Sequence, residues 1–343
     1  MARFPIYKIK NYLIDKKFHP RSIKYLGGGN HFNYKFKSGR RELVLRISNP
    51  KAVGAGEMFN VESEFKLLKL VEKYHVSPKP LILDKKGFSA PVLLESYIWG
   101  TPYAKLRTLD GGALKAALEL IAKTSRIKIS PGFFKFRYQD YSVNIKNWNQ
   151  RIKEIEKIGK RYEVTKKLAG ALKILSRKGA EILNTNKQAL FKAWPEFIYN
   201  DIHGENMFWL KKKKAAVFVD WQKVGYGDPS FMLAVFVLAF ESKASGPKRE
   251  FYAKILKEYK KIRTVKNLDV LFNLRILERE IANAIWIPWH SLKTTGMLPF
   301  KNIRDYSRIS RAENAIKDFA LRKWKIKVLK TKNPLPPRYP LRW

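Results

Sequence analysis

The sequence contains no cysteine among its 343 residues. A disulfide framework, a zinc site built from thiolates and a cysteine nucleophile are therefore excluded, and we expect no disulfide-linked partner. Long apolar runs are also missing, because no stretch approaches the roughly 20 residues that cross a bilayer. The first residues, MARFPIYKIKNYLIDKKF, lack the uninterrupted apolar segment of a signal peptide. These absences predict a soluble cytoplasmic protein without a membrane partner.

Acidic residues are scarce relative to basic ones. The chain has 29 Asp and Glu against 70 Lys and Arg, which gives a formal net charge of +41. Such an excess repels itself in a compact fold, and a polyanionic partner offsets the repulsion, nucleic acid first and an anionic membrane second. Adaptation to heat is the alternative, but it raises Lys and Glu together, which this composition does not show. The charge therefore favours contact with nucleic acid.

The first hundred residues predict a small antiparallel sheet with helices beside it. A short helix is expected within residues 5–18, and the strand-like stretches SIKYLGGG, FNYKFKSG and RRELVLRIS follow, separated by glycines. A helical apolar face runs from Val61 to Tyr74, and PLILD and APVLLESYIW read as two further strands. A composition of 45% apolar and 13% aromatic residues is typical of a globular protein.

Beyond Gly100 the pattern changes to long helical periods, as in ALKAALELIAKTS and VTKKLAGALKILSRKGAEIL. One strand-like interlude breaks them: FIYNDIHGENMFWL, four lysines and AAVFVDW, which predict two short strands joined by a basic turn. We therefore expect an α+β fold in two lobes. Residues 1–98 would form a sheet lobe that binds nucleotide phosphates, and residues 99–343 a helical lobe that ends in a basic, proline-rich tail.

Three oxygen-bearing side chains stand out in this interlude. Asp201 and Asn206 lie five positions apart between the short apolar stretches FIY and MFWL, and Asp220 follows the next strand. Phosphoryl transfer needs a carboxylate that orients the attacking hydroxyl and accepts its proton, together with oxygen ligands for Mg²⁺. Asp201 fits the first role, and Asn206 and Asp220 fit the second. Protein kinases have the same Asp-x-x-x-x-Asn step in their catalytic loop.

The segments YNDIHGENMFWL and VFVDWQKVGYGDPSFMLA resemble the signature of the aminoglycoside-phosphotransferase and choline-kinase group of protein-kinase-like enzymes. The resemblance covers about residues 22 to 240. It implies a bilobal protein-kinase-like fold and ATP-dependent transfer of phosphate to an alcohol group, with ATP and Mg²⁺ as cofactors. Carried over by position, it implies Asp201 as catalytic base, Asn206 and Asp220 as magnesium ligands, and Asp228 as a structural carboxylate.

The N-terminal half supplies further residues in the order that this group leads us to expect. Gly27, Gly28 and Gly29 lack a Cβ and can bring backbone amides close to phosphate, although a tight hairpin turn would also explain them. Arg46 stands in the third strand where kinases place a phosphate-binding lysine, with Glu64 as its expected ion-pair partner.

The stretch LLESYIWG fits the hinge whose backbone binds adenine, with candidate residues Glu95, Ser96, Tyr97 and Ile98. Besides Arg46 in place of lysine, two further positions depart from the group's pattern. Tyr199 replaces a histidine two residues before Asp201, and Met232 stands where an aspartate is common. For His203 we favour hydrogen bonds to the loop backbone over a role in substrate contact.

The basic residues indicate which kind of molecule accepts the phosphate. A kinase for choline or a cationic drug presents acidic residues to its acceptor, whereas this chain offers basic stretches such as Lys211 to Lys214. Basic residues near aromatic rings suit RNA, which is held by its phosphates while an unstacked base rests on a ring. For each ring taken alone we favour a place in the core, and it is the net charge of +41 that favours RNA. The aromatic residues near basic stretches are Trp148, Tyr162, Trp209, Tyr259 and Trp324.

The signature and the charge together resemble the archaeal RNA kinase family, which phosphorylates a ribose 2′-hydroxyl in the variable loop of tRNA. This resemblance implies tRNA or another structured RNA as the partner, bound through the basic surface, with Asp201 facing the hydroxyl. The alternatives are a small-molecule kinase, a protein kinase and an RNA-binding module without enzymatic activity.

Overall fold

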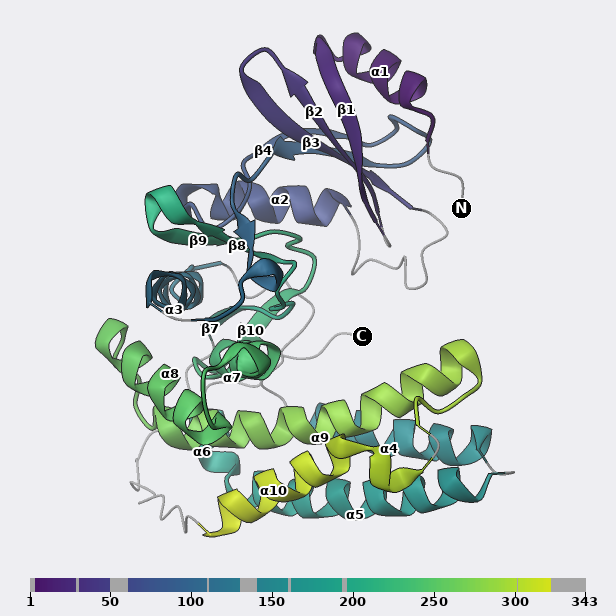
Figure 1. Ribbon diagram of the computed structural model, residues 1–343, viewed down its shortest axis with the longest axis vertical. Helices are drawn as coiled ribbons and strands as arrows, with labels where there is room; N and C mark the ends of the chain where they lie inside the picture. The colour runs from purple at the N-terminus through teal and green to yellow at the C-terminus, as the bar shows by residue number, and fades with distance from the viewer. Residues whose placement is uncertain are drawn as a thin grey trace. The chain divides into compact units, whose positions relative to one another are not determined.

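The computed structural model describes residues 4–28, 31–49, 61–109, 111–129, 141–159, 162–192, 196–300 and 302–321 (Figure 1). The chain forms two compact units. The sheet unit comprises Met1–Ser130, Tyr199–Val224 and Ala239–Arg263. The bundle unit comprises Pro131–Ile198, Gly225–Leu238 and Thr264–Trp343. The expected division at residue 98 stays a prediction, and the basic tail after Leu321 lies outside the described residues.

The main sheet of the sheet unit has antiparallel strands in the order β1-β2-β3-β5-β4. The strands are β1 (Pro20–Gly27), β2 (His31–Ser38), β3 (Arg41–Ser48), β4 (Pro80–Asp84) and β5 (Val92–Ser96). In β2, Phe32, Tyr34 and Phe36 are buried while the residues between them are partly exposed. This alternation follows from the period of two in a strand. The predicted meander and the two further strands are confirmed.

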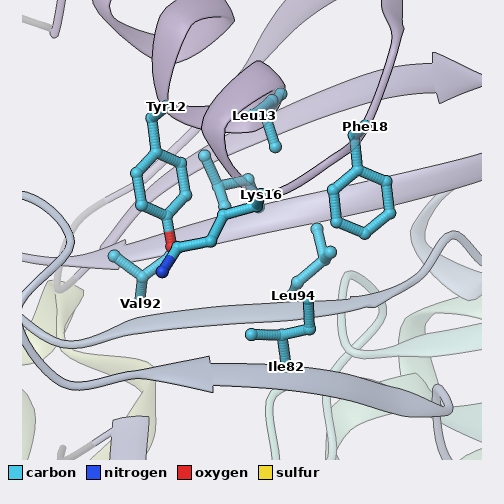
Figure 2. Close-up of a pocket in the computed structure, with 8 residues that line it drawn as sticks. Tyr12, Leu13, Lys16, Phe18, Ile82, Val92 and Leu94 are labelled. Carbon is cyan, nitrogen blue, oxygen red and sulfur yellow. The ribbon is translucent and has the colours of Figure 1, made fainter.

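Helix α1 (Ile6–Asp15) covers this sheet. Its spacing places Ile9 and Leu13 on one face, and both are fully buried. Figure 2 shows the small apolar pocket between helix and sheet, lined by Tyr12, Leu13, Lys16, Phe18, Leu45, Ile82, Val92 and Leu94. These lining residues include none of the predicted site residues, so within the described chain the pocket belongs to the packing of α1.

Helix α2 (Val61–Val71) buries Val61, Leu67, Leu68 and Val71 along one face. Glu64 lies among them and is also buried, which is unusual for a carboxylate without a charged partner. The predicted helix from Val61 to Tyr74 is confirmed, and its last turn, Glu72–Tyr74, is a 3₁₀ helix.

A second small sheet carries the strand-like interlude, with order β6-β8-β9. Its strands are β6 (Thr101–Pro102), β8 (Met207–Leu210) and β9 (Ala215–Phe218). Strands β8 and β9 form an antiparallel hairpin, as predicted, and α3 (Gly111–Ser125) packs against both strands (Figure 1). Helix α8 (Lys248–Ile262) packs against α3 and buries Tyr259.

The bundle unit is mainly helical. Its core is formed by α4 (Tyr141–Ile158), α5 (Glu163–Thr185), α9 (Leu268–Thr295) and α10 (Ser307–Leu321). It also contains α6 (Lys187–Lys192) and most of the paired strands β7 (Glu196–Tyr199) and β10 (Val224–Gly227). Sheet followed by helices confirms the expected α+β class. None of the described helices is long and apolar enough to span a membrane.

Burial decides the predicted aromatic contacts. Trp148 of α4 and Tyr259 of α8 are buried in helical packing, which confirms a place in the core for these two rings and excludes RNA contact through them. Tyr162 is exposed and Trp209 is half-buried. Trp324 lies outside the described residues.

A buried ion pair ties the bundle unit together. Asp228 and Arg275 are both fully buried, and Arg275 Nε donates to the Asp228 carboxylate. Asp228 also accepts from the N–H and hydroxyl of Ser230, one residue before α7 (Phe231–Phe240). Asp228 is thus a structural carboxylate that links the start of α7 to α9. Met232 is buried in the apolar α7.

We expect Asp228→Ala to lower the free energy of unfolding by about 3 kcal/mol, because it leaves the buried charge of Arg275 without one of its partners. The measurement is guanidinium denaturation followed by circular dichroism. The matched control is Glu163→Ala, whose carboxylate pairs with Lys167 where both side chains are more than 60% exposed. That change should stay within about 0.5 kcal/mol. Equal losses in both variants would contradict the assignment.

Candidate functional site

The loop between β7 and β8 brings two of the predicted residues together. The Nδ2 of Asn206 donates to Asp201 Oδ2 at 3.1 Å and to the Asp201 carbonyl at 3.3 Å. The five-residue step therefore closes a turn in which the amide of Asn206 is oriented by the carboxylate. Val219 N–H donates to the carbonyl of Asn206 at 2.9 Å, so the residue before Asp220 lies directly beside this loop.

Tyr199 links the loop to the Asp220 segment. Its hydroxyl donates to the carbonyl oxygens of Val219 at 2.6 Å and Asp220 at 3.2 Å. Its buried ring stacks on Phe218 with centroids 4.2 Å apart. Burial raises the pKa of Tyr199 well above its ordinary value, and the nearby carboxylates add to the effect. The hydroxyl therefore stays a donor, and the tyrosine in place of histidine contributes a structural tie.

Arg46 lies at the centre of a cluster of carboxylates. Its Nη1 is 2.6 Å from Glu64 Oε1, and its Nη2 is 3.0 Å from Asp220 Oδ1. Glu95 is 3.8 Å from the same Nη1. Burial alone would lower the pKa of Arg46, but the three carboxylates outweigh it and raise the pKa. The predicted ion pair between Arg46 and Glu64 is confirmed.

Glu64 also holds the segment that carries Asp220. It accepts hydrogen bonds from the backbone N–H of Trp221 at 2.9 Å and from Gln222 Nε2 at 3.2 Å. Asp220 itself has φ of +59°, a left-handed conformation that is uncommon outside glycine. Its side chain is 37% exposed, against 6% for Arg46 and 1% for Glu64. Asp220 is therefore the carboxylate of this cluster that solvent or a ligand can reach.

The predicted hinge residues have separate placements. The Glu95 carboxyl is buried in the Arg46 cluster, where burial raises its pKa to about 8, Arg46 opposes the rise and the other carboxylates add to it. The Tyr97 N–H donates to the Glu42 carbonyl at 3.0 Å, so this donor is already used by the sheet. Ile98 follows and is partly exposed. Adenine contact by this segment stays a prediction.

The glycine segment is described in part. Gly27 ends β1 with φ of +108°, and a Cβ on Gly28 would lie 1.6 Å from the carbonyl oxygen of His31. Only glycine permits this close approach, so the tight-turn alternative explains Gly28. Gly29 lies outside the described residues. Phosphate contact by the segment stays a prediction.

Sequence reasoning missed the lysine that contacts Asp201. Lys223 Nζ donates to Asp201 Oδ1 at 2.8 Å, and His203 Nε2 is 3.8 Å from Oδ2. Burial would raise the pKa of Asp201, but His203 and Lys223 outweigh it and lower the pKa. Asp201 is therefore ionised at neutral pH. The available signal was the position of Lys223 three residues after Asp220.

His31 and Gln222 also belong to the site, and neither had a clear signal in the sequence. His31 of β2 is buried and contacts Gln222. Burial lowers its pKa to about 4, so the imidazole is neutral at physiological pH. His203 lies as expected, since its Nδ1 accepts from the Glu205 N–H at 3.4 Å.

The donor set fits Mg²⁺. Asn206 uses its Nδ2 toward Asp201, so its amide oxygen is the atom suited to a cation, and Asp220 presents a partly exposed carboxylate. Groups of three or more His, Cys, Asp or Glu suited to a metal do not occur among the described residues. Mg²⁺ is usually bound through one or two carboxylates together with waters and substrate phosphates.

Comparison with known proteins identifies the family of the chain. Residues 22–263 match the sequence profile of the phosphotransferase enzyme family, APH. No curated protein sequence matches the chain.

Solved structures with a similar fold include choline kinase LicA from Streptococcus pneumoniae, at 18% identity and a TM-score of 0.55 over 92% of this chain and 99% of that one. Ethanolamine kinase from Plasmodium vivax has 12% identity and a TM-score of 0.57, with coverage of 92% and 90%. Aminoglycoside phosphotransferase APH(4)-Ia, in a ternary complex with ADP and hygromycin B, has 12% identity and a TM-score of 0.60, with coverage of 91% and 99%. Because the family profile spans more than half of the chain, the protein belongs to the phosphotransferase enzyme family.

Proposed function

We propose that the protein is an ATP-dependent kinase whose acceptor is a hydroxyl group of RNA, the ribose 2′-hydroxyl of a tRNA. The observation that carries the phosphotransfer is the meeting of Asp201, Asn206 and Asp220 around one loop, next to a buried arginine. Family membership supports the reaction class. ADP in the complex of the structurally similar APH(4)-Ia supports an adenine nucleotide as donor.

Asp201 is suited to act as the base. It is ionised, half-buried and held at Oδ1 by Lys223 and at Oδ2 by Asn206, so its orientation is set before substrate arrives. The acceptor hydroxyl donates its proton to this carboxylate while its oxygen bonds to the γ-phosphorus. The bond from that phosphorus to the β,γ-bridging oxygen breaks, and ADP leaves with that oxygen.

Asn206 and Asp220 would hold Mg²⁺, which when bound neutralises charge on the phosphates. Arg46 provides a planar guanidinium that suits phosphate oxygens as well as carboxylates. Its Nη1 is committed to Glu64, and its Nη2 contacts Asp220. Nη2 is thus the end of the guanidinium that lies beside the magnesium ligand, and we assign it to the phosphates of ATP.

The charge of the chain supports RNA over a cationic small molecule. A net charge of +41 repels choline-like or aminoglycoside acceptors and attracts a polyanion over long range. The structurally similar choline and ethanolamine kinases favour the alternative, a small-molecule kinase. The choice between these acceptors is therefore tested directly.

The test incubates the protein with γ-labelled ATP and Mg²⁺ in separate reactions with total RNA, purified tRNA, choline, an aminoglycoside and casein. We expect label in tRNA, located by mass spectrometry at a single ribose. Label confined to choline or the aminoglycoside would contradict the RNA acceptor and support the small-molecule kinase. Label in casein alone would indicate a protein kinase.

Asp201→Asn should reduce kcat for transfer by about 10² to 10⁴, because a positioned proton acceptor contributes about that factor. The amide keeps the shape of the side chain, so RNA binding and the unfolding midpoint should stay near wild type. Asp15→Asn, at an exposed position of α1, is the matched control and should retain full activity. Undiminished transfer by Asp201→Asn would contradict the role of this carboxylate.

Lys223→Met should move the acid limb of the kcat/KM profile to higher pH. Lys223 helps lower the pKa of Asp201, and without it burial, which raises that pKa, has more weight. The variant must then lose its ionised base at a higher pH than wild type does. Lys115→Met, at an exposed lysine of α3, is the control and should leave the profile unchanged. An unshifted acid limb in Lys223→Met would contradict this electrostatic role.

A further inference from the structure

The turn between β8 and β9 consists of four consecutive lysines, Lys211 to Lys214, and all four are exposed. Lys211–Lys213 form a 3₁₀ turn, which the hydrogen bond from Lys214 N–H to the Lys211 carbonyl closes at 3.2 Å. Lys214 has a left-handed backbone, with φ of 48°, and leads into β9. The turn has a defined backbone, so four ammonium groups extend from one small element.

These charges have no partners within the described part of the chain: no carboxylate there lies within ion-pair distance of Lys211, Lys212, Lys213 or Lys214. Some exposed lysines of the sheet unit have such partners, such as Lys248 with Glu241 at 3.1 Å and Lys85 with Glu62 at 3.2 Å. Four like charges in one turn repel one another, and a polyanion that contacts several of them offsets that repulsion.

The turn is attached to both predicted magnesium ligands. Strand β8 begins directly after Asn206, and β9 ends two residues before Asp220, with Met207 paired to Phe218 at that end. Leu210 pairs with Ala215 at the other end, next to the lysines. At about 3.3 Å per residue, Lys211 lies about 17 Å along the hairpin from Asn206.

The hairpin is supported along its length. Trp209 pairs with Thr101 of β6, and the space beside Gly112 of α3 is filled by the Trp209 ring, which a Cβ there would approach to 3.5 Å. An anion bound at the turn is thus held at a set distance from the magnesium ligands. A span of about 17 Å corresponds to about five nucleotides of a stacked strand, at about 3.4 Å per nucleotide.

We propose that the Lys211–Lys214 turn binds the phosphodiester backbone of the RNA acceptor, about five nucleotides from the reacting ribose. The inference rests on the proposed function and adds the place at which the RNA is held. Lysine ammonium groups act as flexible point charges, so the turn positions the strand without reading its bases. It makes long RNA a better acceptor than a short fragment of the same sequence.

The first test is the salt dependence of RNA binding, measured by fluorescence anisotropy with a labelled tRNA and a labelled single strand of twelve nucleotides. The variant combines Lys211→Gln, Lys212→Gln, Lys213→Gln and Lys214→Gln. The control combines Lys8→Gln, Lys10→Gln, Lys17→Gln and Lys24→Gln, which removes the same charge from exposed positions on α1, the turn after it and β1. The variant should flatten the slope of log K against log salt for the single strand by about three, and the control by less than one.

The second test compares phosphate transfer to tRNA and to a dinucleotide that contains the acceptor nucleotide. Relative to wild type, the variant with all four lysines of the turn changed to glutamine should have a kcat/KM for tRNA that is at least tenfold lower. Its kcat/KM for the dinucleotide should be unchanged, because the dinucleotide is too short to reach the turn. The double variant Lys212→Gln, Lys213→Gln leaves Lys214 at the left-handed position. It should produce about half of the change in slope, so the inference stays testable if the quadruple variant folds poorly.

The outcomes separate this inference from the proposed function. The quadruple lysine variant could show the expected flatter slope of log K against log salt while the wild-type protein labels only small molecules. That result would overturn RNA as the acceptor but keep the turn as an RNA-binding site. If the protein labels RNA, but the quadruple lysine variant and the control have the same slope of log K against log salt and the same kcat/KM, only the RNA-binding role of the turn is overturned. Binding to poly-glutamate is measured in the same way as a comparison. If the quadruple lysine variant loses binding to poly-glutamate but binds RNA as wild type does, the turn binds an acidic protein and the inference is overturned.

Discussion

The buried guanidinium of Arg46 is the interaction on which the candidate site depends. It draws together Glu64 of α2, Glu95 of β5 and Asp220 after β9, which are distant in the sequence. A buried charge that loses one partner costs about 3–5 kcal/mol, so these elements keep their places as a group. Glu64 extends the constraint by accepting the Trp221 N–H, which supports the left-handed backbone of Asp220.

A second set of contacts joins this cluster to the loop of Asp201. The Tyr199 hydroxyl donates to the carbonyl oxygens of Val219 and Asp220, and the Val219 N–H donates to the carbonyl of Asn206. The predicted base and the predicted metal ligands are therefore positioned by one hydrogen-bonded network. A displacement of either segment changes the geometry of the other, and a reaction that needs in-line alignment is sensitive to small displacements.

Carboxyl groups gather at the site, although the chain as a whole is strongly basic. Acidic groups gather around Arg46 and Lys223, while the whole chain carries +41. The overall field attracts a polyanion from a distance, but the local carboxylates repel its phosphates at close range. A divalent cation held by Asn206 and Asp220 would offset that local repulsion. The basic surface attracts a polyanion, and a cation at the site would allow its phosphates to approach the carboxylates. Both features suit an anionic phosphate acceptor and an anionic phosphate donor.

The sequence by itself determined the features that short-range patterns encode. Alternation along β2, the apolar face of α2 and the five-residue step from Asp201 to Asn206 follow from backbone periodicity and turn geometry, and each was predictable. The pair of Arg46 and Glu64 was predictable only through the resemblance to a known family.

Tertiary structure alone decided which distant side chains meet. It placed Lys223 on Asp201, brought the Glu95 carboxylate into the Arg46 cluster, and buried Trp148 and Tyr259 among the helices. A lysine, a glutamate or an aromatic ring is compatible with surface or interior in the sequence. Its environment depends on how the strands and helices pack, and packing is set by contacts between residues that no local pattern connects.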